Sequence, residues 1–62
     1  MTVFDLALIT FCETRARVIT ERGEWNGTCE QLRNADHINN REVTLTWIED
    51  GMLIIDATNY NC

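Results

Sequence analysis

The side chains best suited to chemistry are one histidine, three cysteines and a set of carboxylates spread over 62 residues. His37 follows Asp36, and a neighbouring carboxylate can orient an imidazole for acid–base catalysis. That pair lies in a polar stretch with no nucleophile at a recognisable spacing, and the chain has no phosphate-binding or hydrolase motif. Glu49 and Asp50 precede Gly51 and are more typical of a turn than of a metal site. We therefore expect no catalytic residue, no cofactor and no enzymatic activity.

Cys12, Cys29 and Cys62 are an odd number of thiols without a CxxC pair. A disulfide framework usually has an even count, and a zinc site needs closely spaced Cys and His ligands. The first residues, MTVFDLALITFC, lack a basic segment and contain an Asp, which is typical of neither a signal peptide nor a membrane span. The sequence predicts a cytoplasmic protein that binds no metal or membrane, with Cys12 and Cys29 as small core residues.

The charge balance is acidic: ten carboxylates face five basic residues, all of them Arg, and the net charge is −5. Counterion release on nucleic acid requires a basic surface, so we expect no direct high-affinity binding to DNA or RNA. An acidic domain instead suits a protein partner with a basic surface, although the charge also serves solubility alone. The chain is expected to form one domain, 1–62, and a domain of this size buries only about 60% of its unfolded surface.

The clearest pattern lies in residues 42–57, EVTLTWIEDGMLIIDA. Val43, Leu45 and Trp47 alternate with threonines, which predicts a half-buried strand with Trp47 in the core. The turn at Gly51 leads to a returning strand over 52–55 that is apolar on both faces. The alternative is a small winged-helix DNA-binding regulator of phage type with a recognition helix over 41–50, but the β-branched residues and the acidic side chains of this segment oppose it.

The first half of the chain predicts a helix and a hairpin. Phe4, Leu8, Phe11 and Cys12 share one helical face, which predicts a helix over 3–13. Alternation predicts a strand over 14–21 and a second over 24–32, with Trp25 and Cys29 inside and Gly27 allowing close approach. Thr28 and Gln31 also match a capping box that would begin a helix, but we favour the strand. A polar loop with an inward Ile38 follows over 33–40, and residues 58–62 add a small strand or fray.

These elements predict an α+β, mainly β fold. An N-terminal helix caps a small, strongly bent antiparallel sheet that forms an Sm-like or SH3-like partial barrel. We expect a monomer or a weak homo-oligomer, the latter through pairing of an exposed strand with a second copy.

The order of elements resembles a known family. It begins with Phe4 and Asp5, reaches Cys12 at the end of a helix and turns at Gly23, before REV at 41–43 and LIID at 53–56. In length, order and sign of charge, residues 4–60 are similar to Rof (YaeO), the family of small acidic inhibitors of the transcription terminator Rho. The family's longer acidic segment before the helix has no counterpart among these residues. The resemblance implies an Sm-like fold that docks on the RNA-binding domain of Rho, blocks RNA and acts in antitermination.

The candidate binding residues follow from the charge and from this resemblance. In that family the acidic residues near the helix replace RNA phosphates, and Asp5 matches that feature. The other carboxylates of the helix and first hairpin are expected on the same surface, and Trp25 is a candidate aromatic anchor. The predicted partner-binding set is Asp5, Glu13, Glu21, Glu24, Trp25 and Glu30.

Overall fold

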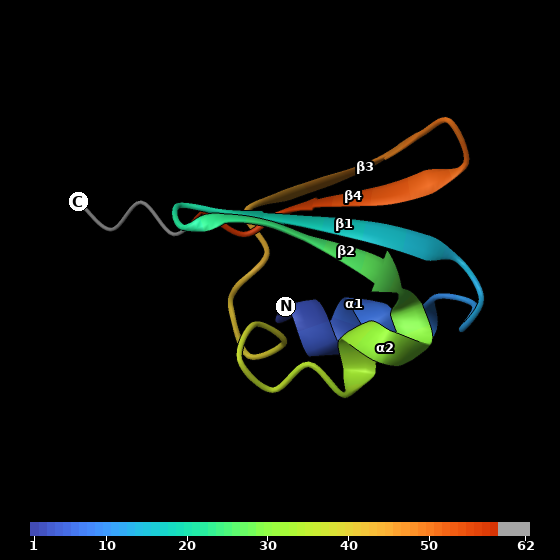
Figure 1. Cartoon of the computed structure of the whole chain (residues 1–62), viewed down its shortest axis with the longest axis horizontal. Helices are drawn as coiled ribbons and strands as arrows, with labels where there is room; N and C mark the ends of the chain where they lie inside the picture. The colour runs from blue at the N-terminus through green and yellow to red at the C-terminus, as the bar shows by residue number, and fades with distance from the viewer. Residues whose placement is uncertain (59–62) are drawn as a thin grey trace.

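The computed structural model describes residues 1–58, so the expectations for residues 59–62, including Cys62, lie outside the described part of the chain. The elements are α1 (Val3–Ile9), β1 (Arg15–Thr20), β2 (Gly23–Thr28), α2 (Cys29–Arg33), β3 (Leu45–Glu49) and β4 (Met52–Asp56). The strands form one curved sheet, and both helices lie on the same side of it (Figure 1). The predicted class, α+β and mainly β with an N-terminal helix against a bent sheet, is confirmed.

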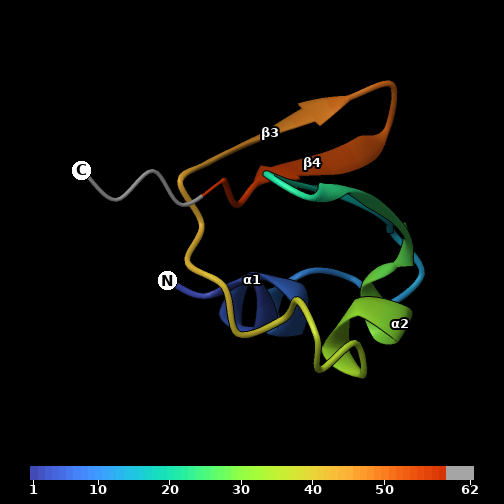
Figure 2. The ribbon, with the colours of Figure 1, turned by 60° about the vertical axis from the view of Figure 1, so that its left-hand side comes forward.

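The sheet has the order β2-β1-β4-β3 and does not close into a barrel. β1 pairs with β2, and β3 with β4, as antiparallel hairpins. At the centre, however, β1 and β4 are parallel, with Val18 opposite Ile55. The expectation of a purely antiparallel sheet is therefore wrong. Residues 29–44 carry the chain back beneath the sheet, so that β4 enters beside β1 in the same direction (Figure 2).

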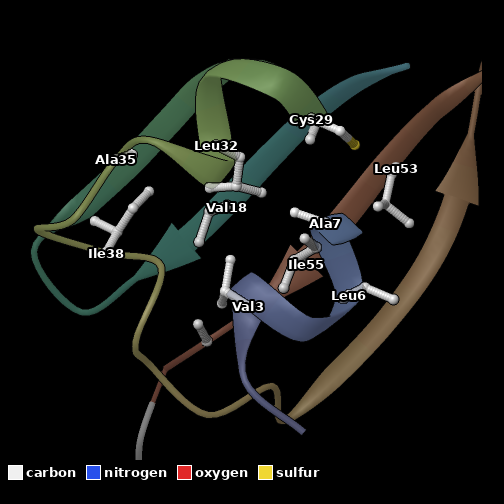
Figure 3. Packing of buried hydrophobic residues seen from close by; sticks show 12 residues of the cluster. Val3, Leu6, Ala7, Val18, Cys29, Leu32, Ala35, Ile38, Leu53 and Ile55 are labelled. Atoms are coloured by element: carbon white, nitrogen blue, oxygen red, sulfur yellow. The ribbon is translucent and has the colours of Figure 1, made fainter. Parts of the chain in front are cut away.

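The core lies between the helices and the inner face of the sheet, and its buried side chains come from α1, α2, β1, β4 and the segments that follow α2 and β4. Its largest fully buried residues are Leu32, Ile55, Val3, Val18 and Cys29 (Figure 3). Trp25 and Val43 pack against the edge of this cluster. Ile38 points inward from the loop after α2, as predicted. The expected roles of the two described cysteines divide: Cys29 is buried in the core, whereas Cys12 is only partly buried.

Helix α1 is shorter than predicted and buries a different face. Thr2 and Asp5 form a capping box that begins it, and Thr10 ends it in extended conformation, so the prediction of a helix to residue 13 is wrong. The buried side is Val3, Leu6 and Ala7, whereas the predicted core residues Phe4, Leu8 and Phe11 are exposed. Both sets have helical spacing, and Val3 and Ala7 are small enough to let the helix lie close to the sheet.

The segment around Thr28 contains a strand followed directly by a helix, the two structures that its sequence allows. Strand β2 ends at Thr28, and the predicted strand from Cys29 to Leu32 is wrong because the chain there is helix α2. The Thr28 hydroxyl accepts a bond from the Gln31 backbone, and the Gln31 side chain accepts one from the Thr28 backbone. This reciprocal cap satisfies donors that a helix start otherwise leaves unpaired. The strand therefore stops where the capping box can begin a helix.

The predicted hairpin at 42–57 is confirmed, and strand β3 excludes the winged-helix alternative with a helix over 41–50. Asp50 and Gly51 take positive φ angles of 54° and 73° in its turn. Residues 53–55 are buried on both faces, as expected. Trp47 was expected in the core, but every residue of β3 is exposed. The reason is the position of β3 in the sheet. It is an edge strand, and none of its residues belongs to the core cluster that the helices cover.

Candidate protein-binding site

Strand β3 exposes apolar side chains on both of its faces. Directly paired residues of an antiparallel ladder point to the same side, so Ile48 shares the inner face with Leu53, and Trp47 shares the outer face with Ile54. The exposed fractions of Leu45, Trp47 and Ile48 are 60%, 38% and 64%. Single exposed apolar residues are ordinary, but β3 exposes Leu45 and Trp47 on its outer face and Ile48 on its inner face, so both faces of this edge strand are open to a partner.

On the outer face, a row of side chains crosses the sheet from Trp47 through Ile54 to Arg17, in register on β3, β4 and β1. Ile54 is only 5% exposed, although neither helix lies on this face. The Trp47 indole Nε1 donates to Glu49 Oε1 at 3.1 Å, which fixes the ring beside a carboxylate. The outer surface of β3 therefore presents an oriented aromatic ring with a negative charge next to it.

Negative charge is concentrated in the same hairpin. Residues 1–41 contain six carboxylates and all five arginines, a formal charge of −1, whereas residues 42–62 contain four carboxylates and no basic residue, a charge of −4. Glu42 lies 3.4 Å from the N-terminal amine, and Asp50 makes no ion pair with any residue of 1–58. The β3–β4 hairpin consequently combines the most acidic part of the chain with exposed apolar residues. A second exposed apolar set, Phe4, Leu8, Ile9 and Phe11, lies on α1 and the loop after it. We name Leu45, Trp47, Ile48, Glu49 and Asp50 the hairpin surface.

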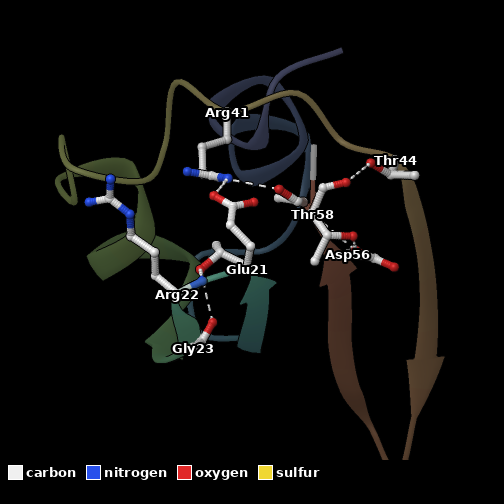
Figure 4. Close-up of polar contacts among 9 residues, drawn as sticks. Glu21, Arg22, Gly23, Arg41, Thr44, Asp56 and Thr58 are labelled. Atoms are coloured by element: carbon white, nitrogen blue, oxygen red, sulfur yellow. Dashed lines mark hydrogen bonds and ion pairs between the residues drawn. The ribbon is translucent and has the colours of Figure 1, made fainter. Parts of the chain in front are cut away.

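The predicted partner-binding residues do not form one surface. Three of them are engaged locally, and Figure 4 shows one of these, Glu21, beside Arg41. Asp5 accepts a bond from the Thr2 backbone at 3.1 Å, and this bond holds the pKa of its carboxyl below the ordinary value. Glu21, in the β1–β2 turn, pairs with Arg41, and Glu24 lies 3.5 Å from Arg17. These carboxylates serve the fold where they lie, and their role in binding stays a prediction.

The remaining members lie elsewhere. Glu13 precedes β1 and Glu30 begins α2, and the bond from the Glu30 backbone to the Cys12 carbonyl brings these two segments together. They lie at the end of the first hairpin opposite to Glu21, a separation of roughly 20 Å along strands of six residues. Trp25 is half-buried on the inner face, opposite Val18. The prediction of one acidic face on the first hairpin assumed a topology that the chain does not have.

Sequence reasoning missed the hairpin surface, although two signals mark it. Trp47 and Ile48 are adjacent, so a strand places them on opposite faces, and burial on one face can hide only one of them. The absence of basic residues after Arg41 is visible in the sequence as well. Together, these two signals indicate an acidic hairpin in which both faces of β3 stay exposed to solvent.

Other chemistry in the described chain is limited. Within residues 1–58, no three His, Cys, Asp or Glu side chains come together to hold a metal ion. Burial raises the pKa of the Cys29 thiol, which keeps it protonated and unreactive. Among these residues, neither helix has the length and apolar character needed to cross a bilayer.

No protein-family model matches the chain, and searches of curated proteins and solved structures give no match either. The functional argument therefore rests on the residues and their arrangement.

Proposed function

We propose that this chain is a non-enzymatic regulator that binds the basic nucleic-acid-binding surface of a protein partner through the hairpin surface. One observation carries the proposal: the hairpin of β3 and β4 combines exposed Leu45, Trp47 and Ile48 with three carboxylates and no basic residue. Apolar and aromatic anchors supply most of the affinity of protein interfaces, while complementary charge raises the association rate and selects the partner.

The proposed mechanism is competition with nucleic acid. Glu49 and Asp50 lie at the tip of the hairpin, where they can approach Arg and Lys side chains that otherwise contact phosphates. The Trp47 ring, beside Glu49, occupies the position of a stacked base. The partner then loses access to DNA or RNA without any chemical change.

The named candidate for the partner is Rho, on the resemblance to the Rof family, and the setting is the cytoplasm. That resemblance implies a contact near Asp5, whereas the exposed apolar residues and the charge favour the hairpin surface. The two contacts lie on different elements, so mutagenesis separates them. Binding at either one supports the regulator, and only the hairpin variants test the surface proposed above.

The test is a titration of the labelled protein with purified Rho, followed by NMR, and competition with Rho-bound RNA. We expect Trp47→Ala to weaken binding at least tenfold, because interface aromatics are frequent anchors. Phe11→Ala is the control, since Phe11 is an aromatic residue of the α1–β1 loop that is even more exposed than Trp47, at 68% against 38%, and it changes binding less than twofold. Asp50→Asn slows association and reduces its salt dependence, whereas Glu13→Gln does not.

Two results would contradict the proposal. If Rho and a set of other basic nucleic-acid-binding proteins all leave the spectrum unchanged, the chain is not a regulator of this class. If Rho binds but Phe11→Ala or Asp5→Asn weakens it as much as Trp47→Ala, the partner stands and the hairpin surface is wrong.

A further inference from the structure

A pocket of about 330 Å³ lies at the end of the sheet opposite to the β3–β4 turn. It opens between the β1–β2 turn and the loop that follows α2, and its lining includes Arg22, Trp25, His37, Ile38 and Arg41. Small-molecule sites are typically concave, of ~300–1,000 Å³, with an apolar wall and a few convergent polar groups. This pocket has both components.

The apolar wall is formed by Trp25 and Ile38. Ile38 is buried, and Trp25 is half-buried and packs against the core. The indole lies over Gly27, where an added Cβ would be 2.6 Å from the Trp25 Cη2 atom. Glycine at this position therefore leaves room for the ring beside the strand, and Trp25 also lines the pocket. A rigid aromatic face of this kind suits a second planar ring.

The polar component contains two arginines, in a protein that is otherwise strongly acidic, and one carboxylate, Glu24, which lies 3.5 Å from Arg17. Arg41 is held in place: it pairs with Glu21, its Nε donates to the Ala57 carbonyl at 3.2 Å, and only 23% of its side chain is exposed. Arg22 makes no ion pair and no side-chain hydrogen bond within residues 1–58. Figure 4 shows both guanidinium groups reaching the space under the loop that carries Arg41.

We propose that this pocket binds a small aromatic anion, a planar ring that carries one phosphate or carboxylate group. The ring lies against Trp25 and Ile38, and the anion receives a forked pair of hydrogen bonds from Arg22, with Arg41 adding charge from a fixed position. His37, which also lines the pocket, supplies a further hydrogen-bonding group. The site is separate from the hairpin surface, and its occupation does not depend on the proposed function.

The experiment uses a Trp47→Phe background, so that Trp25 is the only indole and its fluorescence reports the pocket. Adenosine monophosphate and phenyl phosphate are the probes, which distinguish a nucleotide from a simple aromatic acid. Adenosine, which has the ring without the phosphate, and inorganic phosphate, which has the charge without the ring, are the half-ligand controls. We expect saturable quenching by at least one probe, with the half-ligands at least tenfold weaker, and NMR shifts at Gly23 and His37.

Arg22→Gln should weaken probe binding at least tenfold. Arg15→Gln is the matched control, because Arg15 is also exposed and unpaired within residues 1–58 but lies at the other end of β1, and it changes binding less than twofold. An unchanged backbone spectrum shows that both variants remain folded. The proposal is overturned if neither probe saturates below about 1 mM, if inorganic phosphate binds as tightly as the probes, or if Arg15→Gln has the same effect as Arg22→Gln.

Discussion

Strands β3 and β4 belong to one hairpin and have similar compositions, LTWIE and MLIID, yet they differ completely in burial. Leu53, Ile54 and Ile55 of β4 are buried, whereas every residue of β3 is exposed. β4 lies between β1 and β3 with the helices on one side, and β3 has a neighbour on one edge only. The difference shows that position in the sheet, and not apolar content, decides which strand forms the core.

The two strands therefore contribute differently to the stability of the fold. Full burial of an Ile or Leu side chain contributes about 1.5–3 kcal/mol, and an exposed one contributes little. The apolar residues of β4 therefore stabilise the fold, while those of β3 remain available for a partner. An edge strand with exposed apolar residues is a hazard for aggregation, and the carboxylates of the hairpin reduce that hazard by repulsion between copies.

The largest test of this contrast compares two isoleucines. Ile55→Ala removes a fully buried side chain and is expected to lower the free energy of unfolding by about 2–5 kcal/mol. Ile48→Ala, on the exposed strand, should change it by less than about 0.5 kcal/mol. Urea unfolding followed by circular dichroism measures both, and Ile55→Val, expected at about 0.5–1.5 kcal/mol, gives a graded value. Equal losses at the two positions would refute the contrast.

A second test concerns the close approach of Trp25 to Gly27. Gly27→Ala places a Cβ 2.6 Å from the indole and from the Gln31 Oε1 atom, so the ring or the α2 cap must move. Overpacking of this kind costs about 1–3 kcal/mol of unfolding free energy. In a Trp25→Leu background the same change should cost clearly less, because one of the two contacts is gone. If the cost is the same in both backgrounds, the ring does not lie over Gly27.

A smaller effect is expected at the junction of β2 and α2. Thr28→Ala removes the hydroxyl that accepts the Gln31 backbone N–H, at a cost of about 1 kcal/mol in unfolding free energy. Thr28→Ser retains the hydroxyl and should remain close to the wild type. Chemical denaturation measures the two variants side by side. A destabilised Thr28→Ser would mean that the methyl group, and not the cap, is what matters at this position.

The smallest effect is the response to acid. Hydrogen bonds from Thr58 hold the pKa of Asp56 below its ordinary value of 3.8, and the bond from Thr2 does the same for Asp5. Both carboxylates therefore stabilise the fold at pH values above 3.8, and this contribution is lost as the pH falls through the lowered pKa values. Asp56→Asn should flatten the fall in unfolding free energy below pH 4, measured by denaturation at a series of pH values. An unchanged slope would show that Asp56 does not gain from its bonds to Thr58.

The sequence predicts those parts of the fold that depend on local pattern. The turn at Gly51 and the two-faced strand before Asp56 follow from neighbouring residues, as do the strand of Val18 and the start of α1. The errors arise where two local solutions compete. Helical spacing offers both Phe4 with Leu8 and Val3 with Ala7 as the buried face, and only the sheet decides between them. Thr28 ends a strand and begins a helix, so a prediction that assigns residues 24–32 either to a strand or to a helix is wrong for part of them.

The candidate site was harder to predict for the same reason. Glu13 and Glu21 are close in sequence but lie at opposite ends of a strand. Trp47 follows the alternation of a half-buried strand, but no helix covers the face of β3 on which it lies. Burial of an alternating strand requires a layer on top of it, and that layer is set by which edge the strand occupies. The parallel register of Val18 with Ile55 joins segments that no local rule connects.

That parallel register also governs how the molecule is made. The central pairing of the sheet joins β1 to β4, so neither hairpin alone can complete the core. This pairing closes a loop of more than thirty residues. During synthesis the chain must leave the ribosome as far as Asp56 before β1 acquires its inner neighbour. A chain that ends before Met52 contains the residues of the first hairpin and of both helices but lacks β4, which pairs with β1 and packs beneath the helices. Folding of these residues is therefore completed only when β4 arrives beside β1.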